Sequence, residues 1–254
     1  MRIIPSDRIS PKHLVPLLPQ GLQQRIRDSH YLSKPKSACL TDEVDLGVIA
    51  ELVKKGDTMM DIGANFGLFT RFLSEQVGEE GKVYSFEPTA AMSRILNHNV
   101  DSLNLENVET SSCALSDKVG TAQINMPLHN NQSPNYYEAS LCEINDAEIG
   151  EVDTVETTTL DAFCDARELE GLSFIKCDVE GHEIAVLNGA RITLEKFRPI
   201  ILLEVNKPLD EEGHGREVRD LIRYPGNEIH LFENGVIRNR EDGEFFVNYV
   251  LLPV

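Results

Sequence analysis

Four apolar runs of this sequence each end in an acidic residue, and these acids are the side chains best suited to chemistry. They are Asp61, Glu87, Asp178 and Glu204. A carboxylate can accept hydrogen bonds from hydroxyl groups, balance a positive charge or take up a proton as a general base. Their placement indicates a site that binds a small polar molecule and can remove a proton.

The stretch from Asp61 to Gly67 has the form of a turn that approaches a ligand. It closes an apolar run and precedes an amphipathic pattern, which predicts a strand, a tight turn and a helix. Gly63 and Gly67 permit a sharp turn and a close approach, and free amides at a helix start favour an anionic group. Glycines at this spacing also occur for packing alone, so this stretch by itself indicates a nucleotide-type cofactor no more strongly than a structural turn.

A second group of polar residues follows the apolar run that ends at Cys177. Asp178, Glu180 and His182 come next in the chain, and Glu204 follows a later run. Open α/β sheets bind ligands outside the carboxyl ends of their strands, so we expect these four residues to meet at that edge. We hypothesise that one of the acids or His182 is a general base.

These residues also have structural interpretations. Lys176 and Asp178 point to the same face if the strand persists, and a buried Lys176–Asp178 ion pair would simply hold the strand ends. His182 lies at a predicted helix start, where its side chain can face solvent. Three carboxylates and an imidazole would suit magnesium or manganese, but no spacing in the sequence requires a metal, and none is expected.

The elements that must position these residues alternate between strands and helices. This alternation predicts an α/β fold with a parallel sheet and right-handed crossovers. The nearly all-apolar run at 199–205 fits a central strand covered on both faces. Strands near 228–232, 236–238 and 245–252 follow one another without helices, which predicts an antiparallel end to the sheet. A single helix is expected at 183–197.

Residues 125–156 interrupt the alternation. Their first part is rich in asparagine and proline, and an acidic run follows from Glu143 to Asp153. We expect a long irregular insert, either a lid or binding loop or a flexible excursion. Tyr136, Tyr137 and Ser140 are its candidates for substrate contact.

Composition narrows the architecture and the classes of partner. A chain of 254 residues with 41% hydrophobic content supports one large domain, expected at 39–254 after an irregular or helical arm at 1–38. The net charge of −18 argues against nucleic acid and membrane as partners. The five cysteines show no paired spacing, which argues against a disulfide framework or a zinc site. No signal peptide or membrane-spanning run is visible, so a cytoplasmic protein is expected.

Five short blocks stand in a recognisable order. They are Asp61–Gly67, Phe86–Pro88, Ala114–Asp117, Ile175–Glu183 and Arg198–Glu204. Together they closely resemble the FkbM family of S-adenosylmethionine-dependent methyltransferases, from about Asp42 to Leu252. The resemblance implies a Rossmann-like seven-stranded methyltransferase sheet, with six parallel strands and one antiparallel, an antiparallel C-terminal hairpin and helices on both faces.

The resemblance also implies a cofactor, S-adenosyl-L-methionine, and the residues that hold it. Its methionine part would be surrounded by Asp61, Gly63, Asn65 and Gly67. Glu87 would accept hydrogen bonds from the ribose hydroxyls. The backbone at Cys113 and Ala114 would lie near the adenine, whereas a turn-capping role suits Asp117 better.

The implied activity is methyl transfer to a hydroxyl of a small-molecule or glycan acceptor, such as a sugar or secondary metabolite in natural product biosynthesis. Nitrogen acceptors and a homo-oligomer stay open. An NAD(P)-dependent oxidoreductase would share the strand–turn–helix unit, but the stretch from Gly63 to Gly67 lacks the Gly-x-Gly-x-x-Gly pattern. A non-catalytic module that binds the cofactor or serves as a scaffold is the third interpretation.

Overall fold

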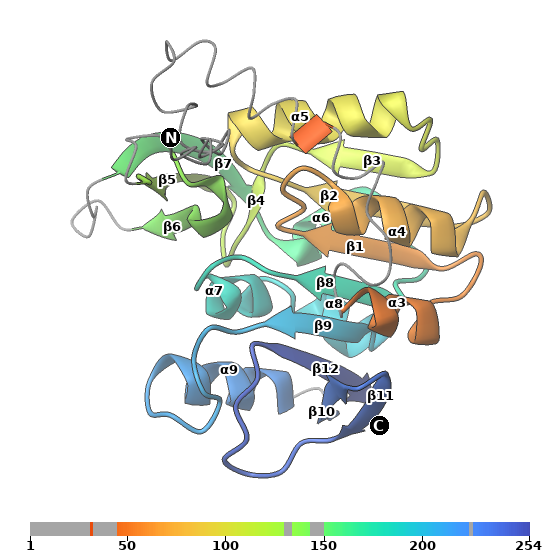
Figure 1. The fold of residues 1–254 in the computed structure, drawn as a ribbon, viewed down its shortest axis with the longest axis vertical. Coiled ribbons are helices and arrows are strands. Elements are labelled where there is room, and N and C mark those ends of the chain that lie inside the picture. The colour runs from red at the N-terminus through yellow and green to blue at the C-terminus, as the bar shows by residue number, and fades with distance from the viewer. Residues whose placement is uncertain (1–30, 33–44, 130–133, 143–149, 224–225) are drawn as a thin grey trace, which may run out of the picture.

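The computed structural model describes residues 31–32, 45–129, 134–142, 150–223 and 226–254 (Figure 1). Most of the predicted arm at 1–38 and residues 143–149 of the acidic run lie outside these ranges. None of the helices within them is long and apolar enough to cross a membrane.

The main sheet combines parallel strands with an antiparallel end. The parallel strands are β1 (Thr58–Ile62), β2 (Lys82–Phe86), β3 (Val108–Ser111), β8 (Phe174–Cys177) and β9 (Ile200–Glu204). The antiparallel end consists of β10 (Asn227–Glu233), β11 (Val236–Asn239) and β12 (Asn248–Pro253). The strand order is β11-β10-β12-β9-β8-β1-β2-β3, with β12 between β9 and β10 (Figure 1).

This topology confirms the predicted fold class and corrects the strand count. β10 runs in the direction of the five parallel strands and β12 runs against them, as the resemblance implies. The described sheet nevertheless has eight strands rather than seven, because β11 adds an edge strand beside β10. Asn234 and Gly235 between them have φ values of 53° and 79°, and this left-handed pair makes a tight hairpin.

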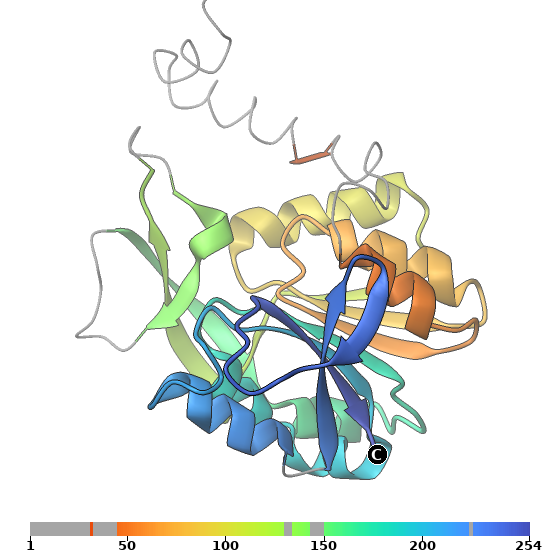
Figure 2. The same cartoon turned by 60° about the horizontal axis from the view of Figure 1, so that its bottom comes forward.

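Helices cover both faces of the sheet (Figure 2). One face carries α3 (Leu46–Leu52), α4 (Leu68–Val77) and α5 (Ala90–Ser102), and the other carries α6 (Leu160–Ala166), α7 (Glu183–Asn188), α8 (Arg191–Phe197) and α9 (His214–Arg223). Along β9, Ile201 and Leu203 pack into the core under α6 to α9, and Leu202 packs into the core under α3 to α5. The apolar run is therefore buried on both faces, as predicted.

The helix expected at 183–197 is in fact two helices, α7 and α8. The first of these helices ends at Gly189, where an added Cβ would lie 2.0 Å from the carbonyl oxygen of Ser116. Only glycine permits this approach. It brings the segment after β4 (Ala114–Leu115) against the end of α7.

The insert predicted as irregular forms strands in its described part, so that prediction is wrong. β5 (Gly120–Pro127) and β7 (Gly150–Thr158) pair antiparallel from Gly120↔Thr157 to Pro127↔Gly150. With β4 and β6 (Ser140–Cys142) they form a second sheet, in the order β4-β7-β5-β6. Ile124 and Val155 give it a small core of its own. Figure 1 shows this accessory sheet at the end toward which the parallel strands point.

Candidate functional site

The turn after β1 is packed so tightly that side chains at its glycines would clash with neighbouring atoms. Gly63 has a φ of 77°, and a Cβ there would lie 1.8 Å from the carbonyl oxygen of Asp178. The amides of Gly63 and Ala64 donate to the Phe86 carbonyl, and the Gly67 amide donates to the Ala64 carbonyl. These amides are used within the protein, so the expected anion-binding role does not apply to them.

Glu87 ends β2 and is held by three donors. Its Oε2 accepts from the Asn65 amide at 2.9 Å, and its Oε1 accepts from the amide and hydroxyl of Thr89 at 2.9 and 2.5 Å. The side chain is buried, and burial raises its pKa although these donors act in the opposite direction. The carboxylate is thus fixed in one orientation, with lone pairs left for a ligand.

A cavity of about 110 Å³ opens beside Glu87. Five of the predicted cofactor residues line it, namely Gly63, Asn65, Glu87, Cys113 and Ala114. The accessory sheet covers it with Ile124 and Leu141, and the short helix η2 (Tyr136–Glu138) adds Tyr136 and Tyr137. The buried Oδ1 of Asn65 has no hydrogen-bond partner among the described residues. We therefore call this the cofactor cavity.

The other two predicted cofactor residues lie beneath this surface. Asp61 is fully buried, and its Oδ2 accepts a hydrogen bond from the Thr70 hydroxyl at 2.6 Å. Burial raises the pKa of Asp61, and Lys176 and Thr70 act against that rise. Gly67 begins α4, and a Cβ there would lie 2.7 Å from Cδ1 of Leu96. Both residues support the turn from behind, since neither lines the cofactor cavity.

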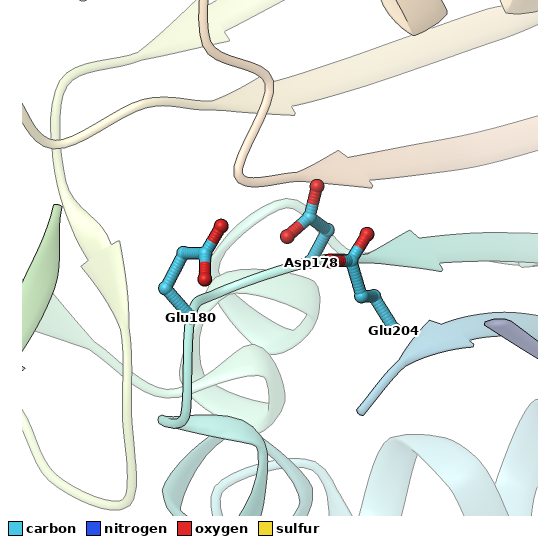
Figure 3. A group of neighbouring side chains, drawn as sticks. All are labelled: Asp178, Glu180 and Glu204. Atoms are coloured by element: carbon cyan, nitrogen blue, oxygen red, sulfur yellow. The ribbon is translucent and has the colours of Figure 1, made fainter. Parts of the chain in front are cut away.

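Three of the four predicted catalytic residues come together at the ends of β8 and β9. Carboxylate oxygens of Asp178, Glu180 and Glu204 lie within 4.8 Å of one another (Figure 3). Glu180 reaches this group because its φ of 50° and the φ of 95° at Gly181 turn the chain back after the strand. A left-handed glutamate is an unfavourable conformation, and such conformations concentrate at functional sites. We call these three residues the acid cluster.

Two members of the acid cluster, Glu180 and Glu204, have pKa values raised to near neutral pH. Burial, followed by the charge of Asp178, raises the pKa of Glu204 to about 7. Burial together with Asp178, Glu183 and Glu138 raises the pKa of Glu180 to about 7. Two carboxyl groups that titrate close to the working pH have the proton affinity that a general base needs.

Lys176 lies under the acid cluster. Its ammonium donates to Oδ2 of Asp178 and to the carbonyl oxygen of Gly63, both at 3.1 Å, and stands 3.9 Å from Oδ1 of Asp61. Burial alone would lower its pKa, but Asp178 and Asp61 more than offset burial and raise the pKa above its usual range. The predicted Lys176–Asp178 ion pair is confirmed, and this lysine is a permanent cation.

His182, the fourth predicted catalytic residue, is not part of the acid cluster. Its Nε2 lies 2.9 Å from the Ser116 hydroxyl, which also donates to Asp117 at 3.2 Å. Burial lowers the pKa of His182, so the ring is neutral at physiological pH. The side chain lines the cofactor cavity near β4. Glu183 accepts from the Gly181 amide at 2.8 Å, as expected of an acid at a helix start.

A second cavity, of about 210 Å³, adjoins the first. The two share Gly63, Asn65, Tyr137 and Asp178. The second is also lined by Glu204, Phe69, Asp45 and Asn248, and the Asn248 amide donates to Asp45 at 2.7 Å. We call it the acceptor cavity. Of the insert residues predicted to contact substrate, Tyr137 lines both cavities, Tyr136 lines the first, and Ser140 lines neither.

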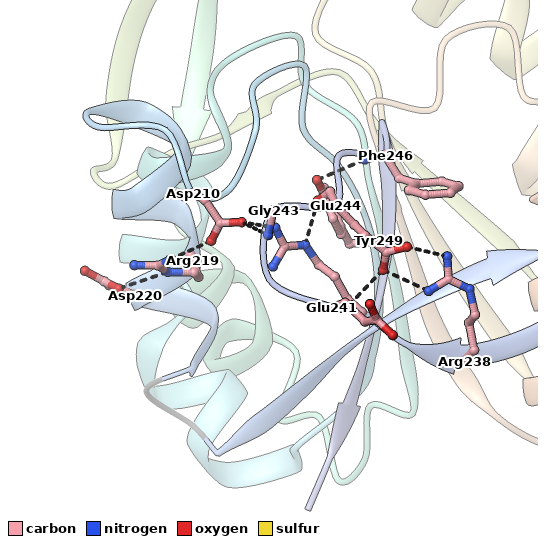
Figure 4. A network of polar contacts seen from close by, with 10 residues as sticks. Asp210, Arg219, Asp220, Arg238, Glu241, Gly243, Glu244, Phe246 and Tyr249 are labelled. Carbon is pink, nitrogen blue, oxygen red and sulfur yellow. Dashed lines mark hydrogen bonds and ion pairs between the residues drawn. The ribbon is translucent and has the colours of Figure 1, made fainter.

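A polar network fixes the loops that carry the wall of the acceptor cavity (Figure 4). Asp210, in the loop after β9, accepts from Arg219 at 2.7 Å, from the Gly243 amide at 2.8 Å and from the buried Arg240. Arg238 pairs with Glu244 in the loop before β12. The two loops that flank Glu204 and Asn248 are therefore tied to each other.

The family model described as Methyltransferase FkbM domain matches residues 61–229, which is more than half of the chain. The chain belongs to the FkbM methyltransferase family. It is an S-adenosylmethionine-dependent methyltransferase, so the predicted family, activity and cofactor are confirmed, and the oxidoreductase interpretation is not favoured.

Individual relatives of this FkbM methyltransferase are distant. The 2-O-methyltransferase NoeI of Sinorhizobium fredii is 28% identical over 189 residues, which cover 70% of this chain and 74% of that protein. A solved FkbM methyltransferase from Methylobacillus flagellatus is 14% identical with a TM-score of 0.49, and the match covers 77% of this chain but only 43% of that one. An O-methyltransferase from Bacillus cereus in complex with SAH is 14% identical with a TM-score of 0.49, over 97% of this chain and 93% of that one.

The residues of the FkbM methyltransferase site fit S-adenosylmethionine. The cofactor carries ribose hydroxyls and an ammonium, both of which are donors, and the lining offers the acceptors Glu87 and Asn65 Oδ1. Apolar contacts from Phe86, Leu115 and Ile124 suit a flat aromatic base. Because Gly63 has no side chain, the turn can pack directly against the Asp178 carbonyl, which occupies the space that a Cβ would need.

Proposed function

We propose that this FkbM methyltransferase methylates a hydroxyl oxygen and that Glu204 takes the proton from that hydroxyl. The observation that carries the proposal is the acid cluster at the junction of the cofactor and acceptor cavities. A neutral hydroxyl is a weak nucleophile until a base accepts its proton. A base is therefore the group that oxygen methylation requires from the protein.

Glu204 is the best placed member of the acid cluster for this role. It lines the acceptor cavity, whereas Glu180 lines the cofactor cavity and Asp178 lines both. With a pKa of about 7, its carboxylate is mostly ionised at pH 8 and can still hold a transferred proton. S-adenosylmethionine, when bound, supplies an electrophilic methyl group.

The lining of the acceptor cavity suits a polyhydroxylated acceptor. Glu204, Asp45 and Asn248 offer acceptor oxygens for hydroxyl groups, and Phe69 and Tyr137 add aromatic surface. The 28% identical relative is named a 2-O-methyltransferase, which also supports a hydroxyl acceptor. We therefore propose a sugar or sugar-containing small molecule as the acceptor class. A nitrogen acceptor would instead have to bind as a free amine beside three carboxyl groups.

The test incubates the protein with S-adenosylmethionine and a panel of methyl glycosides, with matched aminosugars as nitrogen acceptors. S-adenosylhomocysteine is quantified, and mass spectrometry locates the added methyl group. We expect turnover with glycosides and methylation at oxygen. Methylation of amino nitrogen alone would overturn the oxygen assignment. Cofactor binding by calorimetry with no turnover on either class would favour the non-catalytic interpretation.

We propose transfer without a metal, although the three carboxylates alone have suitable ligand types. Turnover should survive exhaustive chelation, and recovery only on addition of magnesium or manganese would contradict this.

We also propose a domain boundary between residues 38 and 39, a cytoplasmic location and the absence of nucleic-acid partners. The formal charge of −18 supports the last of these.

A further inference from the structure

We propose that Lys176 is a positioning residue for methyl transfer, because its ammonium joins the turn at Gly63 to Asp178 of the acid cluster, and both of these residues line the two cavities. The inference rests on the proposed function, since it assigns a task within that reaction. Lys176 lines the acceptor cavity, and as a cation it is not the proton acceptor. It acts through the groups that it holds.

The contacts of Lys176 reach both halves of the site. One hydrogen bond goes to the carbonyl oxygen of Gly63, which lines both cavities, and the other goes to Oδ2 of Asp178, each at 3.1 Å. The lysine side chain is 7% exposed, whereas that of Asp178 is 28% exposed. The buried cation thus orients a carboxylate that can still reach a ligand. A shift of the ammonium would move the turn and Asp178 relative to each other.

Lys176 is itself held from behind. Its strand position is in register with Asp61 of β1, and Asp61 is fixed by the Thr70 hydroxyl, which lies 3.0 Å from the Ser85 hydroxyl. The ammonium also lies over the ring of Phe69, 5.1 Å from the ring centre. These partners come from β1, β2 and α4, so the position of the ammonium is set by three elements.

A purely structural ion pair would be a weak reason to bury this lysine. Burying a charged pair is often no more stabilising than packing apolar side chains of the same size. The charged groups that act on the ammonium are Asp61 on β1, Asp178 after β8 and Glu204 on β9, all of them acids. Glu180 lies close to Asp178 and Glu204. Lys176 is therefore the counter-charge of the acid cluster. Its removal also leaves the buried Asp61 without a cation, so the experiment must separate an effect on the chemistry from a loss of stability.

The experiment compares Lys176→Met with a matched control, Lys82→Met. Lys82 is the first residue of β2 and is 38% exposed, so its loss removes the same charge away from the site. For Lys176→Met we expect kcat to fall by about 100-fold or more, as a misplacement near 1 Å can cause, while the Kd for S-adenosylmethionine rises less than about tenfold. Lys82→Met should keep both values. An unchanged kcat in Lys176→Met would overturn the proposal.

The pH profile separates positioning from simple loss of stability. Burial is the main cause of the raised pKa of Glu204, and Lys176 opposes it. Without the lysine that pKa rises further, so the acid limb of the kcat profile should move to higher pH in Lys176→Met. Lys176→Arg keeps the charge, and its limb should stay in place while kcat falls. If Lys176→Met does not fold, Lys176→Arg tests the proposal by itself. Full activity of Lys176→Arg would show that the exact position of the Lys176 ammonium between Gly63 and Asp178 is not needed.

A double variant tests whether Lys176 acts through Asp178. If it does, adding Lys176→Met to Asp178→Asn should lower kcat only slightly further, because the group to be positioned is already neutral. Losses that multiply fully would overturn the inference. The proposed function fails separately, if the unaltered protein binds S-adenosylmethionine but methylates no hydroxyl acceptor.

Discussion

The carboxylates at the two ends of the site have contrasting surroundings. At the cofactor end, Glu87 is buried and receives three donors from Asn65 and Thr89. In the acid cluster, Glu204 on the acceptor cavity and Glu180 on the cofactor cavity stand beside other acids, and their pKa values rise to about 7. A satisfied carboxylate gives fixed recognition, whereas a poorly compensated one keeps its affinity for a proton. Binding and proton removal are therefore divided between two ends of one sheet edge.

The largest expected effect is at the acceptor end. Glu204→Gln should lower kcat by about 10²–10⁴-fold, because an amide cannot take up the hydroxyl proton. The Kd for S-adenosylmethionine should change little. Single-turnover rates with the best glycoside, together with calorimetry on the same sample, measure the two quantities. A rate close to that of the unaltered protein would place the base at Asp178 or Glu180 instead.

At the cofactor end the loss should appear in affinity. Glu87→Ala should raise the Kd for S-adenosylmethionine by about 10- to 100-fold. The change removes the carboxylate proposed to accept hydrogen bonds from the ribose hydroxyls and leaves buried amides without partners. Glu79→Ala, on the exposed loop after α4, is a control. Calorimetry gives the Kd, and circular dichroism confirms the fold. Unaltered affinity would refute the ribose assignment.

The pH dependence of kcat should come from the acid cluster. Below pH 7 the rate should fall by about tenfold per unit, because the base must be ionised and its pKa lies at about 7. Glu180 titrates in the same range, so the apparent pKa belongs to the pair. A kcat that is constant from pH 6 to 8 would show that proton removal does not limit the rate.

His182 offers a sharper version of the comparison. It lines the cofactor cavity and pairs with Ser116, so His182→Ala should weaken cofactor binding by about threefold to tenfold and leave kcat at saturating cofactor nearly unchanged. Calorimetry and saturation kinetics measure both values. If kcat instead falls as far as in Glu204→Gln, the original hypothesis of a catalytic His182 is right.

The smallest expected effect concerns stability. Because the folded-state pKa values of Glu180 and Glu204 are raised, the stability that these groups contribute is present below pH 4.5 and is lost as the pH rises through 7. Glu180→Gln should therefore raise Tm at pH 8 by roughly 2–4 °C for each kcal/mol regained. The gain should shrink toward pH 5 and vanish below pH 4.5. Thermal melts at both pH values check this, and a lower Tm at pH 8 would contradict it.

Much of the cofactor end was predictable from the sequence, because acids and glycines at strand ends carry local signals. Gly63 and Asn65 follow β1, and Glu87 follows the next strand, β2. The structure places all three on the cofactor cavity. The Lys176–Asp178 pair followed from strand parity alone. His182 did not join the acids because the left-handed turn at Glu180 and Gly181 ends that parity.

The acceptor wall was not predictable, because it depends on pairings between distant segments. Asn248 faces Glu204 through the register of β12 with β9, and Asp45 joins it from the segment before α3. No spacing along the chain signals such a contact. The accessory sheet was missed for a similar reason, since β5 and β7 pair across residues whose composition is typical of loops.

The position of β12 has a consequence for the order in which the site is assembled. This strand is the last of the sheet in sequence, yet it is inserted between β9 and β10. A chain emerging from the ribosome presents β1, β2 and the Gly63 turn first, although a domain generally folds as a unit. The wall of the acceptor cavity cannot be completed until β12 has been synthesised, whereas every segment that lines the cofactor cavity is available earlier.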